Sequence, residues 1–171
     1  MGCHITRNRE KKGLKFNHHF YAQMITDRFE INKTAMVPMT AGDRSQTPEE
    51  KGKVRRSPYL EAVGALMWAS TMSWPDISSA VCTAAKCCEN PGMVNWKAVV
   101  KIQLYVRRTQ GTGTTYGGGG NGGIEMRAFA DSGHATCLDT RRSISGSTSV
   151  CGRDQLVLVH PGDHCGRHFG G

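Results

Sequence analysis

The chain has 171 residues, enough for a domain of ordinary size with a hydrophobic core, and it carries a formal net charge of +8 with 21 glycines and seven cysteines. No apolar run approaches the roughly 18 residues of a membrane-spanning helix, and the start MGCHITRNREKKG lacks the apolar core of a secretory signal. An odd number of cysteines without a C-x-x-C pair favours reduced thiols. We therefore expect an intracellular chain with no membrane contact, whose charge permits a polyanionic partner.

Residues 1–40 are predicted to form a β-hairpin and a helix. Within residues 3–16, polar and apolar residues partly alternate on both sides of the turn-like sequence REKKG, which is typical of paired strands. Residues 18–31 carry apolar residues at near-helical spacing, which predicts an amphipathic helix. These residues are Phe20, Met24 and Phe29, with Tyr21 and Ile25. A polar, proline-containing linker is expected over residues 41–57.

Residues 58–110 are predicted to form a three-helix subdomain. The first helix begins at SPYLEAVG, where Ser57 is a suitable N-cap and Pro58 a suitable first helical residue. Its expected apolar stripe contains Leu60, Val63 and Met67, with Leu66. The second helix starts near WPD and stops at the sequence NPG, and the third covers MVNWKAVVKIQLYVRRTQG.

The third helix interleaves basic and aromatic residues. Its basic residues are Lys97, Lys101, Arg107 and Arg108, and its aromatic residues are Trp96 and Tyr105. This pattern suits a helix that follows a phosphate backbone, but it suits an ordinary amphipathic helix with a solvated basic face equally well. Both interpretations stay open on the sequence alone.

The remainder of the chain is predicted to be a glycine-rich tether followed by strands. Residues 111–124 contain the run GTGTTYGGGGNGG and are expected to be a flexible tether. The sequence IEMRAFAD, which leads into residues 125–152, is a predicted strand, and a second strand follows it within this range. DQLVLVH, after this range, is a candidate third. The end of the chain is rich in glycine and is expected to be poorly ordered.

Asp131 ends a predicted strand and enters a Ser-Gly turn, a position from which a carboxylate can reach a divalent cation. A two-metal nuclease site, however, needs several carboxylates around metals about 4 Å apart. Glu125 begins the same strand about 20 Å away. By its pattern, Asp131 is therefore a catalytic candidate without partners.

Three collinear blocks of the chain resemble the Pol polyprotein of copia-type retrotransposons. MGCHITRNREKKGLKFNHHFYAQMITDRFEI is similar to the family pattern LGIEI.RDR..K.L.LSQ..YI..IL.RF. SPYLEAVGALMWASTMSWPDI, followed by NPG and W-K-A-V, is similar to PYREAVGSLMYL, TRPDI, NPG and HW.AVK. FADSGHATCLDTRRSISGS is similar to YTDADWAGDLDTRRSTSGY. The resemblance covers residues 1 to about 152.

This resemblance implies a segment that joins reverse transcriptase to ribonuclease H. Asp131 then corresponds to the first metal-binding aspartate of the ribonuclease H site, and Arg141 and Arg142 to basic residues that contact a nucleic-acid backbone. The intact family uses Mg²⁺, and an RNA–DNA hybrid is the implied partner. No cofactor is expected in this chain itself, because Asp131 alone makes an incomplete metal site, and no small-molecule substrate is expected.

Two departures from the family count against an intact catalytic site. The family's DADWAG is DSGHAT here, so that Gly133 replaces the second acidic residue and His134 replaces the tryptophan. Residues 153–171 match nothing in the family, whereas reading permitted codons one base later restores a family-like strand. We therefore expect a +1 frameshift near residue 152 and a poorly ordered tail. The zinc-like set His160, His164, Cys165 and His168 would then arise by chance.

The sequence as a whole predicts an α+β fold, with an N-terminal β-hairpin and helix, a three-helix subdomain and an incomplete ribonuclease H-like antiparallel sheet. The leading functional expectation is a truncated copia-type Pol fragment without independent catalysis. One alternative is a nucleic-acid-binding module derived from the element. The other is a metal-dependent ribonuclease H that another chain completes.

Overall fold

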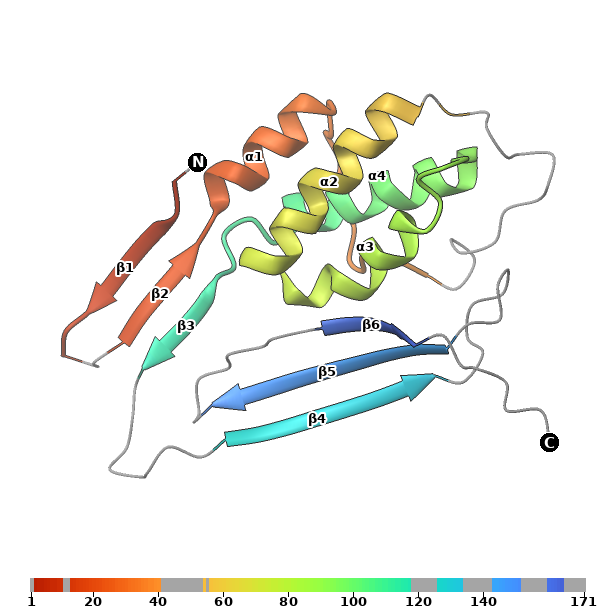
Figure 1. The fold of residues 1–171 in the computed structure, drawn as a ribbon. Coiled ribbons are helices and arrows are strands. Elements are labelled where there is room, and N and C mark those ends of the chain that lie inside the picture. Colours follow the sequence, from red (N-terminus) through yellow and green to blue (C-terminus); the bar gives the residue numbers. More distant parts are fainter. Residues whose placement is uncertain are drawn as a thin grey trace, which may run out of the picture. The chain divides into compact units, whose positions relative to one another are not determined.

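The structure is a computed structural model of the chain. It describes residues 2–10, 13–40, 54, 56–117, 126–133, 143–151 and 160–164. The chain divides into two compact units, residues 1–118 and residues 119–171. Helices and antiparallel strands make up the first unit and an antiparallel sheet the second (Figure 1). The predicted α+β class is confirmed.

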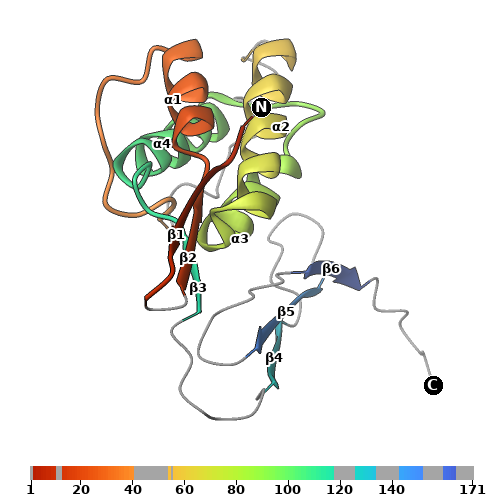
Figure 2. The same ribbon diagram turned by 90° about the vertical axis from the view of Figure 1, so that its left-hand side faces the viewer.

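The first unit begins with the predicted hairpin, formed by β1 (His4–Asn8) and β2 (Gly13–Asn17). The two strands are antiparallel, and all five residues of β1 are exposed. A third strand, β3 (Thr114–Gly117), pairs with β2 and gives the sheet order β1-β2-β3. Figures 1 and 2 both show this sheet at one end of the helices.

β3 lies inside the segment that the sequence predicts to be a flexible tether, so this expectation is wrong for residues 114–117. The sequence Thr-Thr-Tyr has a high strand propensity, and β2 offers an edge to which it can pair. Gly113, the residue before β3, lies very close to the backbone of β2. A Cβ atom on Gly113 would lie 2.4 Å from the carbonyl oxygen of Phe16 and 2.7 Å from the Cβ of Asn17. Here the glycine is required by close packing.

The helices are α1 (His19–Arg28), α2 (Arg56–Met72), α3 (Ser78–Ala85) and α4 (Met93–Arg108). A short 3₁₀ helix, η3 (Pro75–Ile77), precedes α3. Its proline occupies the start of the helix, where a backbone N–H has no hydrogen-bond acceptor within the helix. α4 begins at Gly92, whose backbone N–H donates a 2.8 Å hydrogen bond to Oδ1 of Asn95. The helices that the sequence predicts are therefore all present.

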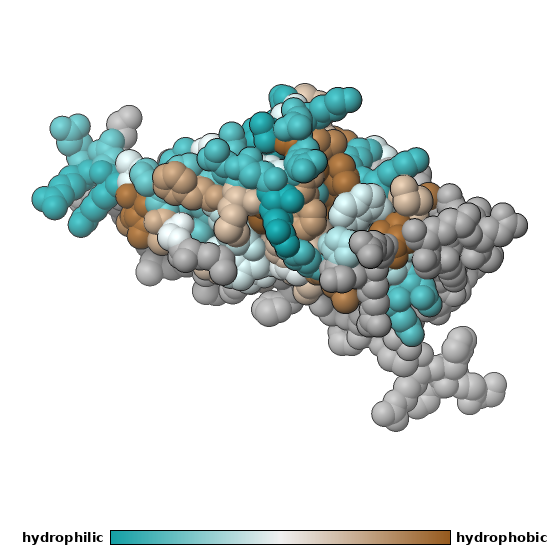
Figure 3. Space-filling view, turned by 90° about the horizontal axis from the view of Figure 1, so that it is seen from above, coloured by the Kyte–Doolittle hydropathy of each residue, from teal (hydrophilic) through white to brown (hydrophobic). Residues whose placement is uncertain are grey.

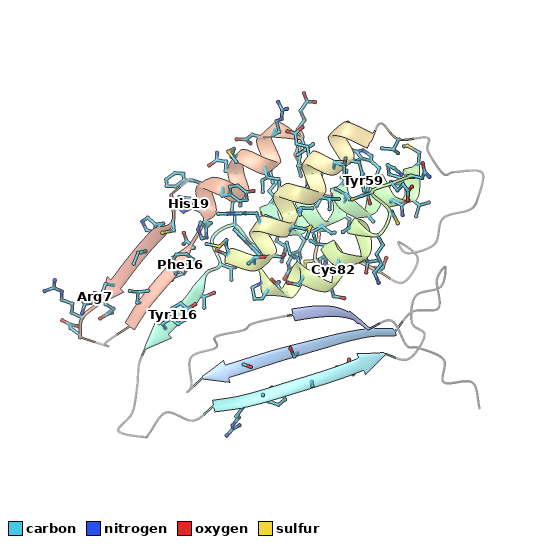
Figure 4. All side chains as sticks on the ribbon, viewed as in Figure 1. Arg7, Phe16, His19, Tyr59, Cys82 and Tyr116 are labelled. Carbon is cyan, nitrogen blue, oxygen red and sulfur yellow. The ribbon has the colours of Figure 1, made fainter. Side chains whose placement is uncertain are left out.

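The core of the first unit lies between the four helices. Its largest fully buried apolar side chains are Trp74, Tyr59, Leu66, Ile77 and Ile102. Two polar ends within this core are satisfied by contacts between elements. The hydroxyl of Tyr59, which lies on α2 (Figure 4), donates to the carbonyl oxygen of Ala84 at 2.8 Å, and Nε1 of Trp74 donates to Oγ1 of Thr109 at 3.0 Å. Tertiary hydrogen bonds thus join α2 to α3 and η3 to the end of α4.

The buried faces of α1 and α2 are rotated from those that the sequence predicts. On α1, the predicted Tyr21 and Ile25 are buried together with Ala22, whereas the predicted Phe20 and Met24 are 64% and 52% exposed. On α2 the predicted Val63 and Leu66 are buried, whereas the predicted Leu60 and Met67 are exposed. The other buried residues of this helix are Tyr59, Ala62 and Ala69. Apolar residues are accordingly mixed with polar ones on the face viewed in Figure 3. Each buried face combines large side chains, such as Tyr21 on α1 and Tyr59 on α2, with small alanines.

The second unit is a three-stranded antiparallel sheet in the order β4-β5-β6. Its strands are β4 (Met126–Gly133), β5 (Ser143–Cys151) and β6 (His160–His164). β6 pairs with the first half of β5, so the expectation of a poorly ordered tail is wrong for residues 160–164. The rest of the candidate strand DQLVLVH lies outside the described residues. In β4, residues 127–131 are all exposed, so both faces of this strand are uncovered.

Candidate nucleic-acid interface and the carboxylate of Asp131

Three of the four basic residues predicted on α4 lie on one side of the helix. Lys97, Lys101 and Arg108 fall within about 40° of one another at 100° per residue. Lys97 and Arg108 are exposed and Lys101 is half-buried. Arg107 lies about 100° from Arg108 around the helix axis. The structure thus separates one predicted residue from the other three.

Two of these basic side chains hold the segment that follows α1. Nη1 of Arg107 donates to the carbonyl oxygen of Ile31 at 2.6 Å, and Nζ of Lys101 donates to Oγ1 of Thr40 at 2.9 Å. Between them, the backbone N–H of Ala35 donates to the carbonyl oxygen of Leu104 at 3.2 Å. These hydrogen bonds hold residues 31–40 against α4. Part of the α4 surface that was predicted to bind nucleic acid is therefore used for packing within the chain.

Tyr105 does not join the basic side of α4 in the way that the interleaved pattern indicates. Its hydroxyl donates to the carboxylate of Asp76 in η3. This hydrogen bond and partial burial together raise the pKa of Tyr105 to about 12. Trp96 is half-buried and packs against the hydrophobic core. The two aromatic residues are thus tied to neighbouring elements, whereas the exposed charges of Lys97 and Arg108 face solvent.

Asp131 lies in β4 opposite Gly146 of β5 and is exposed. The expectation that it ends its strand is wrong, because Ser132 and Gly133 continue the pairing with β5. The other carboxylate residue in the described strands of this unit is Asp163 of β6. Because β5 runs between β4 and β6, the backbones of the two aspartates are about 10 Å apart or more. Among the described residues, no group of three or more histidine, cysteine, aspartate or glutamate side chains could hold a metal ion. The described residues do not fit the two-metal site that the resemblance implies.

Several residues singled out by the sequence lie outside the described residues. Arg141 and Arg142 belong to this group, as do Cys165 and His168 of the zinc-like set. His160 and His164 are the first and last residues of β6. The prediction that the two arginines contact nucleic acid therefore stays a prediction.

The most unusual polar contact in the first unit involves a residue that the sequence did not single out. His18 is 3% exposed, and its Nδ1 makes a short hydrogen bond with Oγ of Ser73. Its ring packs edge-on against Phe16 and Trp68, with centroid separations of 4.6 and 5.1 Å. Burial lowers the pKa of His18. The paired histidines at residues 18 and 19 gave no signal that one of them would join the start of α1 to the end of α2.

Comparisons with known proteins place this arrangement in a family. No family model matches the chain, and no solved structure matches it. The chain is 31% identical over 154 residues to a retrovirus-related Pol polyprotein from transposon TNT 1-94 of Nicotiana tabacum. That match covers 85% of this chain and 11% of the polyprotein. The resemblance seen in the sequence motifs thus extends across most of the chain.

Two shorter relatives match parts of the chain. An uncharacterised mitochondrial protein of Arabidopsis thaliana is 35% identical over 80 residues, which are 47% of this chain and 70% of that protein. A secreted RxLR effector protein of Plasmopara viticola is 29% identical over 93 residues, which are 54% of this chain and 64% of the effector. The chain belongs to the family of retrotransposon Pol polyproteins, and it spans about a tenth of the length of the tobacco polyprotein. Within the described residues, none of the helices has the length and apolarity needed to cross a membrane.

Proposed function

We propose that this chain is part of a copia-type Pol polyprotein, from the region that joins reverse transcriptase to ribonuclease H, and that it has no catalytic activity by itself. The collinear motif blocks support the placement within Pol. The position of Asp131 in β4 carries the proposal about catalysis, because this residue corresponds to the first metal-binding aspartate of the ribonuclease H site.

A two-metal hydrolytic site holds two divalent cations with several converging carboxylates. Asp131 and Asp163 lie in strands separated by β5, at about 10 Å or more. Single carboxylates at that separation do not hold a pair of metals about 4 Å apart. Bound Mg²⁺ would polarise the scissile phosphate in an intact site; in this chain Asp131 would supply one ligand to it.

The test is cleavage of an RNA–DNA hybrid by the full chain in Mg²⁺, with Asp131→Asn as the matched variant. We expect no cleavage above background from either protein. Mg²⁺-dependent cleavage by the wild-type chain that Asp131→Asn abolishes would contradict the proposal. Cleavage that arises only when a second Pol chain is added, and that still requires Asp131, would favour the alternative of a ribonuclease H completed in trans.

The second candidate function is binding of a nucleic-acid backbone by α4. The exposure of Lys97 and Arg108 on the same side of the helix as Lys101 favours it. Contacts to phosphate make binding strongly dependent on salt, and the slope of this dependence falls by about 1 for each basic side chain that is removed from the phosphates. We expect the double variant Lys97→Ala/Arg108→Ala to weaken binding of an RNA–DNA hybrid at low salt and to reduce this slope by about 2.

Arg7→Ala is the matched control for this experiment. Arg7 is an exposed arginine on β1 (Figure 4), away from α4, and its loss also removes positive charge. Weakening by Arg7→Ala that is about half that of the double variant, in proportion to the charge removed, would mean that net charge alone drives binding. Absence of binding by the wild-type chain at low salt would exclude this function.

A further inference from the structure

We propose that His4 and His19 form a two-histidine site that binds one Ni²⁺, Cu²⁺ or Zn²⁺ ion and so joins the beginning of β1 to the beginning of α1. His4 is the first residue of β1, and His19 is the first residue of α1, where Figure 4 labels it. The centroids of the two imidazole rings are 5.5 Å apart, and the ring planes lie at 76° to each other. Both rings belong to the first unit, whereas Asp131 belongs to the second.

The register of the hairpin brings these two histidines together. His4 pairs with Asn17, the last residue of β2, and a single residue separates Asn17 from His19. That residue is His18, which is buried and hydrogen-bonded to Ser73. The step from β2 into α1 is therefore fixed by a buried contact, and the ring of His19 stands beside the first residue of β1.

The hydrogen bonds of both rings leave the same nitrogen for a metal ion. Nδ1 of His19 lies 3.1 Å from Oδ1 of Asn17. An amide oxygen only accepts, so Nδ1 carries the proton and donates it, and Nε2 of the neutral ring holds a lone pair. Nδ1 of His4 contacts Oγ1 of Thr6 at 3.5 Å. Among the described residues, Nε2 of neither ring takes part in a hydrogen bond. Histidines that bind metals commonly engage their other nitrogen in this way.

The separation of the rings fits one shared ion. A histidine nitrogen binds Zn²⁺ at about 2.0–2.1 Å, so two rings on one tetrahedral ion have their centroids about 5 Å apart. The observed separation of 5.5 Å is close to this value. His4 is exposed, and the χ2 torsion of histidine has a broad energy minimum, so its ring can turn Nε2 toward that of His19. Water would occupy the remaining coordination positions.

The ligand type selects the ion, and the surrounding charge limits its affinity. Imidazole nitrogen suits Ni²⁺, Cu²⁺ and Zn²⁺, whereas Mg²⁺ prefers oxygen. The formal charge of +8 and the positive end of the α1 dipole both oppose a bound cation. Lys15 pairs with Thr6 and shares its face of the sheet with His4, but its Nζ donates to the carbonyl oxygen of Gly111 at 3.2 Å. We therefore expect a dissociation constant in the micromolar range.

The experiment titrates the full chain with Ni²⁺, which suits imidazole and does not oxidise thiols. Calorimetry gives the number of ions bound, and amide hydrogen exchange shows where they bind. We expect His4→Gln and His19→Gln each to remove the same equivalent of Ni²⁺, and the double variant to remove no further equivalent. Two separate equivalents, one lost with each histidine, would overturn the shared site.

Hydrogen exchange along β1 distinguishes this site from other histidines of the chain. Ni²⁺ should slow exchange in β1 of the wild-type chain and of the control variant His164→Gln, which lacks a histidine of β6 in the second unit. It should have no such effect in His4→Gln or His19→Gln, and Mg²⁺ should have none in any of these proteins. Slowing that survives either substitution, or that His164→Gln abolishes, overturns the proposal.

The imidazole NMR signals of the wild-type chain give a test that does not depend on how the variants fold. The signals of His4 and His19 should respond together to the same low concentrations of Ni²⁺. A response from one of these rings without the other contradicts the shared site, and so does the absence of any response up to millimolar Ni²⁺.

Discussion

His18 is a buried histidine whose environment favours its neutral form. Its imidazole is enclosed by Phe16 and Trp68 and hydrogen-bonds with Ser73, and burial lowers its pKa from the ordinary value of 6.5. A protonated ring would be desolvated without a counter-charge in these contacts. The first turn of α1 is therefore held by a contact that depends on pH.

The first prediction concerns the pH dependence of stability. Below pH 6.5 the unfolded chain binds a proton at residue 18 that the folded chain does not bind, so the free energy of unfolding falls as the pH is lowered through this window. Above pH 6.5 this contribution to stability is fully present. Urea unfolding on both sides of pH 6.5 measures it. The His18→Gln variant should lose stability less steeply with acid than the wild-type chain, and His19→Gln is the control for removing the neighbouring imidazole. Equal slopes for wild type and His18→Gln would contradict the prediction.

Gln103 is a fully buried polar residue on α4. Its side chain is 0% exposed, and neither its Oε1 nor its Nε2 has a hydrogen-bond partner among the described residues. A buried amide without partners costs about 1–3 kcal/mol. Among the residues of the first unit, Gln103 therefore offers the clearest opportunity to increase stability.

The second prediction is that Gln103→Met stabilises the chain by about 1–2 kcal/mol, because methionine fills a similar volume and needs no hydrogen bonds. Gln103→Ala is the matched variant, and it should be destabilising because it leaves a cavity in the core. Urea unfolding at neutral pH measures both changes. A loss of stability of about 1 kcal/mol or more in Gln103→Met would show instead that the amide makes a favourable interaction inside the folded chain.

Two glycines in different elements illustrate opposite uses of the same residue. Gly113 lies against the backbone of β2 where β3 begins, and it leaves no room for a Cβ atom. Gly64 lies in the interior of α2, where an added Cβ atom would meet nothing within 4 Å. Neither role can be read from the glycine itself, because each depends on what the rest of the chain places beside it.

The third prediction compares alanine at these two positions. Gly113→Ala forces a clash with backbone atoms of β2 and should cost about 1–3 kcal/mol, with β3 displaced from the sheet. Gly64→Ala improves helix propensity without new contacts and should add about 0.5–1 kcal/mol. Thermal unfolding of both variants gives the two values. Changes of the same sign would mean that β3 does not approach β2 so closely at Gly113, or that the surroundings of Gly64 do not accept a methyl group.

The two units differ in how much apolar surface they bury. The core cluster of the first unit extends from Tyr21 in α1 to Val106 in α4 and includes residues from every helix. In the second unit, residues 127–131 of β4 are exposed on both faces of the strand. A strand whose two faces are both exposed gains little from hydrophobic burial. The stability of the chain should therefore reside in the first unit.

The fourth prediction is that residues 1–118 fold on their own and unfold at the same temperature as the full chain, within about 2 °C. Calorimetry of the two proteins under identical conditions tests this. Hydrogen exchange in the full chain should likewise be slowest in α2 and α4 and fast in β4. A clear drop in unfolding temperature on removal of residues 119–171 would show that the second unit stabilises the first.

Local sequence determined the hairpin at the start, the four helices and the strand that contains Asp131. Turn-forming residues, prolines at helix starts and the NPG stop act within a few residues of where they stand, so they can be read without a fold. The order of the three motif blocks also identified the Pol family, because it is a property of the sequence alone. None of these inferences required contacts between distant residues.

Tertiary structure decided which faces are buried and which charges are used. The pairing of residues 114–117 with β2, the choice of Tyr21 and Ala22 over Phe20 on α1, and the use of Arg107 to hold Ile31 all depend on residues far apart in the chain. The same is true of the distance between Asp131 and Asp163, which the strand order sets. The physical reason is that periodicity specifies an element and its approximate apolar side, whereas packing against neighbours selects among adjacent stripes and pairs the remaining polar groups.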